Sequence, residues 1–212
     1  MTNLKNFSPF YLDVLKEAGN IGAGNAATAL SSLLNRKIDM SVPSVRIVEF
    51  EEITKLAGGE EKIVAATFLR IYGEAPGTMF LIIPEQEAVR LAAAMIGQAA
   101  GKQWEIYEDD LAVSALQELG NILAGSYLSA LSDFTNINMQ PSVPAMAVDM
   151  AGALVGAGLA ELSAFADYAI IIDTEVREEG RQRGSVFGQF FLLPDPDSFH
   201  KIFAALGVQI DE

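Results

Sequence analysis

Hydrophobic residues recur along this chain with two different spacings, one typical of helices and one typical of β-strands. From Pro9 to Leu34, apolar residues recur every three or four positions with polar residues between them, which predicts one long helix. Apolar and polar residues then alternate over 37–49 as in a half-buried strand, in which Pro43 predicts a kink or bulge. The elements expected in the first half are a helix at 9–34, a strand at 37–49, a short helix at 51–57, strands at 63–72 and 78–83, and a helix at 84–96.

The second half repeats this order after a linker at 101–108. Its expected elements are a helix at 109–134, a strand at 142–150, a helix of small residues at 151–163, strands at 168–176 and 185–193, and a helix at 195–206. We therefore expect a single domain of residues 1–212 built from two repeats, about 9–100 and about 109–212.

The short connections between neighbouring strands predict antiparallel pairing. The expected fold class is α+β, with duplicated helix–strand–strand–strand–helix units related by a pseudo-twofold axis. The two units either share one antiparallel sheet or pack two sheets together, and the long helices cover one face.

One polar pair recurs inside the two long helices. The stretch Glu17-Ala-Gly-Asn20 returns 101 positions later as Glu118-Leu-Gly-Asn121, and each copy is followed at the same distance by a Val-Pro pair, Val42-Pro43 and Val143-Pro144. Because residues three apart share a helix face, the acid and the amide of each copy project side by side. Their repetition favours a role in chemistry or contact over a merely solvated surface.

Small residues surround the polar pair in the first copy. The stretch Gly22-Ala-Gly24-Asn-Ala-Ala27 matches a dinucleotide-binding fingerprint, but that motif requires a preceding strand and a tight turn. Helical residues precede it here, and the second copy has Leu123 in place of Gly22, so we reject nucleotide binding and regard Gly22 as dispensable. Each glycine inside a helix costs about 0.5–1 kcal/mol relative to alanine, so we expect another backbone to approach closely, from this protein or from a partner.

The composition narrows the classes of function. The chain has 212 residues, no cysteine and a formal net charge of −14. The absence of cysteine excludes disulfides and thiolate metal sites, and an acidic surface repels nucleic acid and anionic lipid. The N-terminus lacks a signal-peptide pattern, and the longest apolar run is shorter than the roughly 20 residues that span a bilayer. We expect a cytoplasmic protein that neither binds nucleic acid nor inserts into membranes.

Both copies of the polar pair extend to the same longer pattern. It consists of an Asp or Ser, then a Glu, then an Asn and a distant Pro, and the chain presents it as Asp13, Glu17, Asn20 and Pro43 and as Ser114, Glu118, Asn121 and Pro144. This pattern resembles the signature of the CheC family of chemotaxis phosphatases. The resemblance covers essentially the whole chain and fits the two-site CheC type better than the single-site CheX or the longer FliY relatives.

The resemblance implies a phosphatase that hydrolyses the aspartyl phosphate of the response regulator CheY. The residues it implies are Glu17, Asn20, Glu118 and Asn121 as catalytic, with Asp13, Ser114, Pro43 and Pro144 in support. The amides would orient the attacking water, the glutamates would contact a lysine of the regulator, and the prolines would be structural. No cofactor of its own is expected, because Mg²⁺ would come with the regulator.

A second implied partner is the receptor deamidase CheD. The segment 148–159 is poor in bulky and polar residues, so it is either buried or a docking surface. As a docking surface it makes Asp149, Ala151 and Ala157 candidate partner-binding residues. The alternative to an enzyme is a non-enzymatic adaptor that binds phosphorylated CheY and CheD.

Overall fold

The computed structural model describes residues 9–97, 109–159, 168–178 and 186–207. The elements of this part of the chain are α1 (Pro9–Leu34), β1 (Ile38–Ser41), β2 (Val45–Glu49), α2 (Phe50–Leu56), β3 (Ile63–Gly73), β4 (Gly77–Pro84), α3 (Glu85–Met95), α4 (Asp110–Thr135), β5 (Met139–Pro141), β6 (Ala145–Met150), α5 (Ala151–Leu159), β7 (Tyr168–Glu178), β8 (Val186–Pro194) and α6 (Pro196–Ala205). The expected linker at 101–108 and the end of the helix expected at 151–163 lie outside the described residues.

The expected helices and strands are present where the structure describes them, with two differences. The single strands expected at 37–49 and 142–150 are each two strands, β1 with β2 and β5 with β6, separated by three residues around the Val-Pro pair. In addition, β5 begins at Met139, earlier than expected. The sequence does not reveal β5 because its three residues, Met-Gln-Pro, are too few to show an alternating pattern.

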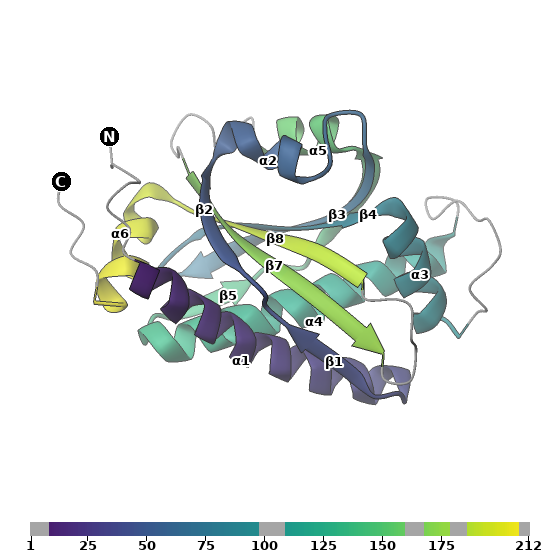
Figure 1. Ribbon diagram of the computed structural model, residues 1–212, viewed down its shortest axis with the longest axis horizontal. Coiled ribbons are helices and arrows are strands. Elements are labelled where there is room, and N and C mark those ends of the chain that lie inside the picture. Colours follow the sequence, from purple (N-terminus) through teal and green to yellow (C-terminus); the bar gives the residue numbers. More distant parts are fainter. Residues whose placement is uncertain (1–8, 98–108, 160–167, 179–185, 208–212) are drawn as a thin grey trace.

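The strands form one antiparallel sheet that both halves share. Its order is β1-β7-β8-β4-β3-β5, with β2 also pairing with β7 and β6 with β3. Figure 1 shows α1 and α4 running in opposite directions across one face of the curled sheet, with α2 and α5 on the other face. The α+β class, the antiparallel pairing and the cover of one face by long helices are confirmed, and the two units share one sheet.

The two halves exchange their first strands. Ile38 and Val45 of the first half lie opposite Glu178 and Ile172 of β7, whereas Met139 and Met146 of the second half lie opposite Gly73 and Thr67 of β3. The spacings between the paired positions are the same in both halves. This correspondence supports the proposed duplication, and it means that each half depends on the other to complete its sheet.

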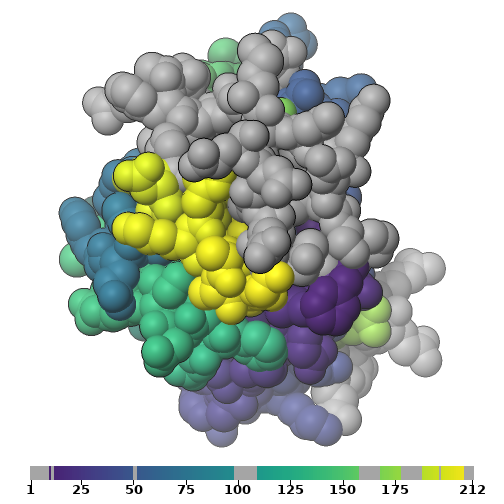
Figure 2. All heavy atoms as spheres, turned by 90° about the vertical axis from the view of Figure 1, so that its left-hand side faces the viewer, coloured from purple at the N-terminus to yellow at the C-terminus, as the bar shows by residue number. Residues whose placement is uncertain are grey.

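The central strands are buried on both faces, so they contribute to two cores. Residues that alternate along β3, β4, β7 and β8 point to opposite sides of the sheet. The larger core lies under α1, α3, α4 and α6, and the smaller lies under α2 and α5. Ile202 and Phe203 of α6 belong to the larger core, and Figure 2 shows α6, in yellow, lying against α1 and α4 at this end of the molecule.

Gly22 of α1 lies against Tyr127 of α4. A Cβ atom on Gly22 would lie 2.8 Å from Cδ1 of Tyr127 and 2.9 Å from its Cα. The expectation that Gly22 is dispensable is therefore wrong, because no side chain fits between these two helices at that point. The expected close approach of another backbone is present within the protein itself.

Tyr127 fills the space that Gly22 leaves, and it is only 3% exposed. Its hydroxyl lies 2.9 Å from Oγ1 of Thr174, and its ring makes an edge-to-face contact with Phe190. Burial raises the pKa of Tyr127 to about 12, and the hydrogen bond with Thr174 opposes part of this rise. The buried tyrosine is therefore held in its neutral form.

This raised pKa predicts a loss of stability at alkaline pH. The unfolded chain ionises this tyrosine near pH 10 and the folded chain only near pH 12. Between these values ionisation favours the unfolded state, by about 2–3 kcal/mol at the upper end. We expect the free energy of unfolding, measured by urea denaturation, to fall above about pH 10, and to fall less in Tyr127→Phe. Tyr72→Phe, at an exposed position, is the control, and an unchanged slope in Tyr127→Phe would contradict the prediction.

Candidate functional site

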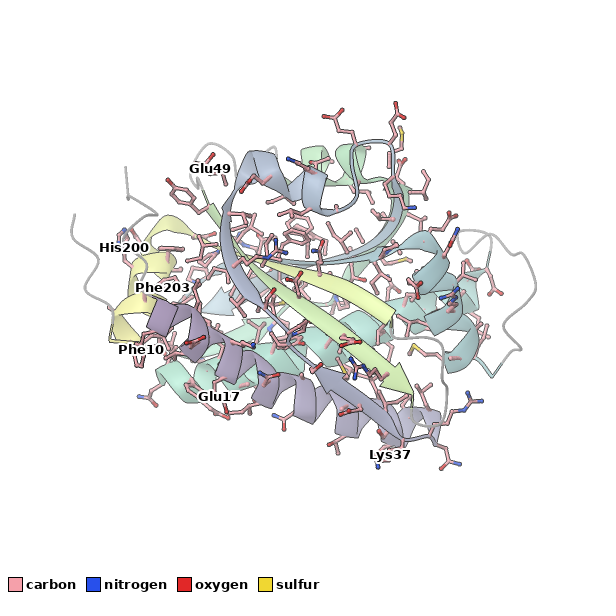
Figure 3. The ribbon with its side chains drawn as sticks, in the orientation of Figure 1. Phe10, Glu17, Lys37, Glu49, His200 and Phe203 are labelled. Atoms are coloured by element: carbon pink, nitrogen blue, oxygen red, sulfur yellow. The ribbon has the colours of Figure 1, made fainter. Side chains whose placement is uncertain are left out.

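The first acid–amide pair lies on an accessible face of α1. Glu17 is exposed and Asn20 is half-buried at the edge of the sheet. Figure 3 shows Glu17 on the side of α1 that points away from the sheet. The Oδ1 atom of Asn20 accepts a hydrogen bond from the backbone N–H of Val42, at 2.9 Å. The carboxylate is therefore free to meet another molecule, whereas the amide is held by the connector between β1 and β2.

Each of the two Val-Pro connectors forms a β-bulge. Ser41 lies opposite Glu175 and Val45 opposite Ile172, so three residues, 42–44, face only two residues of β7. The second connector, 142–144, likewise faces two residues of β3, 69–70. Proline has no N–H to donate to a ladder, and a bulge redirects the residues beside it. In the first half the bulge allows the N–H of Val42 to bond to α1 instead of to a strand.

The second pair has the same residues in a different setting. Glu118 and Asn121 are both exposed, and the Asn121 side chain makes no hydrogen bond to any residue that the structure describes. The two connectors differ as well, since Val42 is 2% exposed and Val143 is 91% exposed. The second amide is therefore not held by its connector as the first one is.

The two pairs form two separate sites. The helices α1 and α4 run antiparallel, and Gly22 of α1 lies against Tyr127 of α4. Asn121 lies six residues before Tyr127, so it lies opposite a position six residues after Gly22, which is about eight residues beyond Asn20 along α1. At 1.5 Å per residue this is about 12 Å along the helix axis, beyond the reach of a hydrogen bond. Asp13 and Ser114 are exposed one turn before the glutamate of each site.

The small residues beside the two sites bring the helices onto the sheet. A Cβ atom on Gly19 would lie 3.3 Å from Cγ2 of Val42, and one on Gly120 would lie 2.5 Å from Cγ2 of Thr67. These two glycines are therefore explained by packing inside the protein. Neither of them supplies evidence for a partner.

The candidate partner-binding residues, which lie at the end of β6 and within α5, do not share one environment. Ala151 is fully buried in the smaller core, whereas Asp149 and Ala157 are exposed. Ala151 therefore cannot contact a partner, and a charge placed there would disturb folding. The segment 148–159 is therefore partly buried and partly exposed, because one side of α5 packs on the sheet and the opposite side faces solvent.

The sequence interpretation missed a polar cluster behind the first connector. The carboxylate of Asp173 accepts hydrogen bonds from the Ser44 hydroxyl, from Nη2 of Arg46 at 3.1 Å and from Nε2 of Gln189 at 3.0 Å. One signal could have revealed it, because Asp173 directly follows the apolar run Ala-Ile-Ile-Ile in a strand. A charged residue at such a position needs partners.

Across 9–97, 109–159, 168–178 and 186–207, the structure shows no group of three or more His, Cys, Asp or Glu side chains placed to hold a metal ion. Over the same ranges, no helix combines the length and the apolar character needed to cross a bilayer. What each site offers is a carboxylate and a carboxamide on a rigid helix. A carboxamide both donates and accepts hydrogen bonds and does not titrate.

The chain is similar to known proteins over most of its length. The model of the CheC-like family matches it twice, over residues 10–47 and 111–147, so that each match contains one site. The CheY-P phosphatase CheC of Bacillus subtilis is 45% identical over 199 residues, which cover 94% of this chain and 95% of that protein.

Two solved structures show a similar fold at low sequence identity. FliY of Thermotoga maritima superposes with a TM-score of 0.75 at 21% identity, covering 95% of this chain and 98% of that one. The complex of CheX, CheY, BeF3 and Mg²⁺ from Borrelia burgdorferi gives a TM-score of 0.50 at 12% identity, covering 82% and 96%. Taken with the 45% identity over nearly its full length, the duplicated acid–amide site identifies this chain as a member of the CheC-like family.

Proposed function

We propose that this protein hydrolyses the aspartyl phosphate of the response regulator CheY, at two sites. The observation that carries the proposal is an exposed glutamate with an asparagine one turn later, on a rigid helix in each half of the chain. The chain as a whole is 45% identical to a CheY-P phosphatase. A carboxylate and a carboxamide displayed together on an accessible helix face suit insertion into the active site of another protein.

The proposed role of each amide is to orient the attacking water. Hydrolysis of an acyl phosphate depends on positioning and on charge stabilisation, and water-orienting amides serve this purpose in related phosphoryl-transfer reactions. Asn20 and Asn121 would each place a water in line with the phosphorus. The Mg²⁺ that neutralises the phosphoryl charge would belong to the regulator, in keeping with the Mg²⁺ of the CheX–CheY complex.

The proposed role of each glutamate is docking. Glu17 and Glu118 would each form an ion pair with a lysine near the phosphoryl group of the regulator. A pair that becomes desolvated on docking fixes the orientation of the partner more than it adds affinity. Asp13 and Ser114, one turn earlier on the same faces, would support this contact.

An adaptor that binds phosphorylated CheY and CheD with little turnover is the alternative. The exposed side of α5 and the preceding strand favour a second docking surface, because Asp149, Met150 and Ala157 are accessible there. We propose this surface, without Ala151, as the place where CheD would bind. Both partners could be bound by the same molecule, since the sites on α1 and α4 lie on the other face of the sheet.

The proposal is tested by measuring phosphate release from phosphorylated CheY in the presence of Mg²⁺. We expect the wild-type protein to accelerate release, and Glu17→Gln with Glu118→Gln to raise KM by about tenfold, because the charge that fixes docking is lost. Asp133→Asn, at an exposed carboxylate near the end of α4, is the matched control. Binding of the phosphorylated regulator without accelerated release would overturn the phosphatase and leave the adaptor.

A further inference from the structure

The amide of the first site is linked to β7 through two hydrogen-bonded contacts, which the backbone of residues 42–44 joins. Oδ1 of Asn20 accepts from the N–H of Val42, which lies in the bulge between β1 and β2. The side chain of Val42 is buried and packs beside Gly19 of α1. A shift of this bulge would therefore move the hydrogen-bond donor that holds the amide.

Asp173 of β7 holds the other end of the same bulge. Its backbone N–H donates to the carbonyl oxygen of Ser44 at 3.0 Å, and its carboxylate accepts from the hydroxyl of Ser44. Arg46 of β2 and Gln189 of β8 donate to the same carboxylate, at 3.1 and 3.0 Å. With three side-chain donors on one carboxylate, Asp173 is fixed in place and Ser44 is fixed through it.

The second half of the chain supplies an internal comparison. Since Val45 opposite Ile172 corresponds to Met146 opposite Thr67, the residues in place of Ser44, Arg46 and Asp173 are Ala145, Ala147 and Phe68. Among the described residues, this half has no acid in the position of Asp173; its connector is tied to β3 by Ser142, whose N–H donates to the carbonyl oxygen of Arg70 at 2.7 Å and whose hydroxyl accepts from the N–H of Arg70 at 3.0 Å. Its connector exposes Val143, and its Asn121 has no hydrogen bond to the residues that the structure describes. The bond that holds the amide is thus present in the half that has the cluster.

We propose that Asp173, acting through Ser44, is a positioning residue for the first site. The inference rests on the proposed phosphatase function. Asp173 and Ser44 do not touch the regulator in this scheme. They fix the bulge so that the N–H of Val42 orients the carboxamide of Asn20 before docking, and the remaining lone pair of Oδ1 accepts the proton of the attacking water. The bulge of the second site is tied to β3 through Ser142, but no residue that the structure describes donates a hydrogen bond to the Asn121 side chain, so this amide is oriented only when the regulator is bound.

The test removes the anchor from each site separately. Asn121→Ala leaves only the first site active, and Asn20→Ala leaves only the second. In the Asn121→Ala background we expect Ser44→Ala to lower kcat for phosphorylated CheY about tenfold with KM unchanged, since a misplaced catalytic group affects the chemical step. In the Asn20→Ala background the same change should have no effect. Ser44→Thr, which keeps the hydroxyl, should restore kcat.

Asp173→Asn serves as a second variant at the other end of the contact. It keeps an oxygen for the Ser44 hydroxyl and weakens the ion pair with Arg46, so we expect a smaller loss of kcat than for Ser44→Ala, again only at the first site. Equal losses at both sites would mean general destabilisation and would overturn the inference. So would an unchanged kcat, or a rise in KM alone.

A measurement without the regulator separates this inference from the proposed function. Hydrogen exchange of the Val42 amide should be slow in the wild type and at least about tenfold faster in both Asn20→Ala and Ser44→Ala, because each removes part of the contact that protects it. If neither the wild type nor any variant accelerates phosphate release, the proposed function fails. The exchange rates of the Val42 amide still show whether Ser44 positions the bulge. Equal exchange rates in wild type and Ser44→Ala would overturn it.

Discussion

Alanine at both Asn20 and Asn121 is expected to reduce the acceleration of CheY dephosphorylation by about 100-fold or more, because the group that orients the water is lost from both sites. The glutamates remain, so the double variant should still bind the phosphorylated regulator. It should also stay folded. Asn121 is exposed, so its replacement removes no internal contact among the residues that the structure describes. Asn20→Ala leaves the backbone N–H of Val42 without its acceptor, which lowers the free energy of unfolding by about 1–3 kcal/mol.

The measurement is phosphate release together with binding of the phosphorylated regulator and the circular dichroism spectrum of each variant. Asn25→Ala is the matched control, because Asn25 is an exposed asparagine of the same helix outside the proposed site. Normal phosphate release by the double variant would show that the amides are not the catalytic groups. The two single variants then give the contribution of each site, which need not be equal because only Asn20 is held by its connector.

Leucine at Gly22 is expected to destabilise the protein by about 3 kcal/mol or more. The change copies Leu123 of the second half, but a Cβ at position 22 would lie 2.9 Å from the Cα of Tyr127 and 3.1 Å from the carbonyl oxygen of Ser126. Backbone atoms of a packed helix cannot move aside as a side chain can, so α1 and α4 must separate. Urea denaturation measures the change in the free energy of unfolding.

Gly24→Ala is the control for this experiment, because the two glycines lie in the same helix and differ only in their surroundings. No atom of the described part of the chain outside the local helix lies within 4 Å of a Cβ at Gly24, so the substitution should stabilise the protein by about 0.5–1 kcal/mol through helix propensity. Opposite signs at Gly22 and Gly24 would confirm that packing decides the outcome. Equal stability of Gly22→Leu and the wild type would refute it.

The order and type of the elements could be predicted because their signals are local. The three- and four-residue spacing over Pro9–Leu34 and the alternation along the strands follow directly from backbone geometry. The same local geometry predicts that Glu17 and Asn20 share a helix face, as do Glu118 and Asn121. What local spacing leaves open is the packing of a residue with no side chain, and for that reason the comparison of Gly22 with Leu123 gave the wrong expectation.

The sequence was enough to locate the candidate site residues, but it did not show which of them are buried or which contacts hold them. The resemblance to the CheC family named both acid–amide pairs, and the structure places each on an accessible helix face. The same reasoning included Ala151 among the partner-binding residues, although it is a core residue. It could not separate the buried from the exposed side of α5, because a helix of alanine and glycine has almost no polar face to mark it.

The sequence by itself determined the helices, most of the strands and the position of each polar pair on its helix, since these depend on residues a few positions apart. Only the tertiary structure decided how the halves exchange strands, where the bulges fall and which amide is held. Asp173 and Ser44 are 129 residues apart, and Val42 lies 22 residues from Asn20. Contacts over such distances depend on the register of paired strands, and that register is set by packing across the whole sheet and not by the pattern of any one segment.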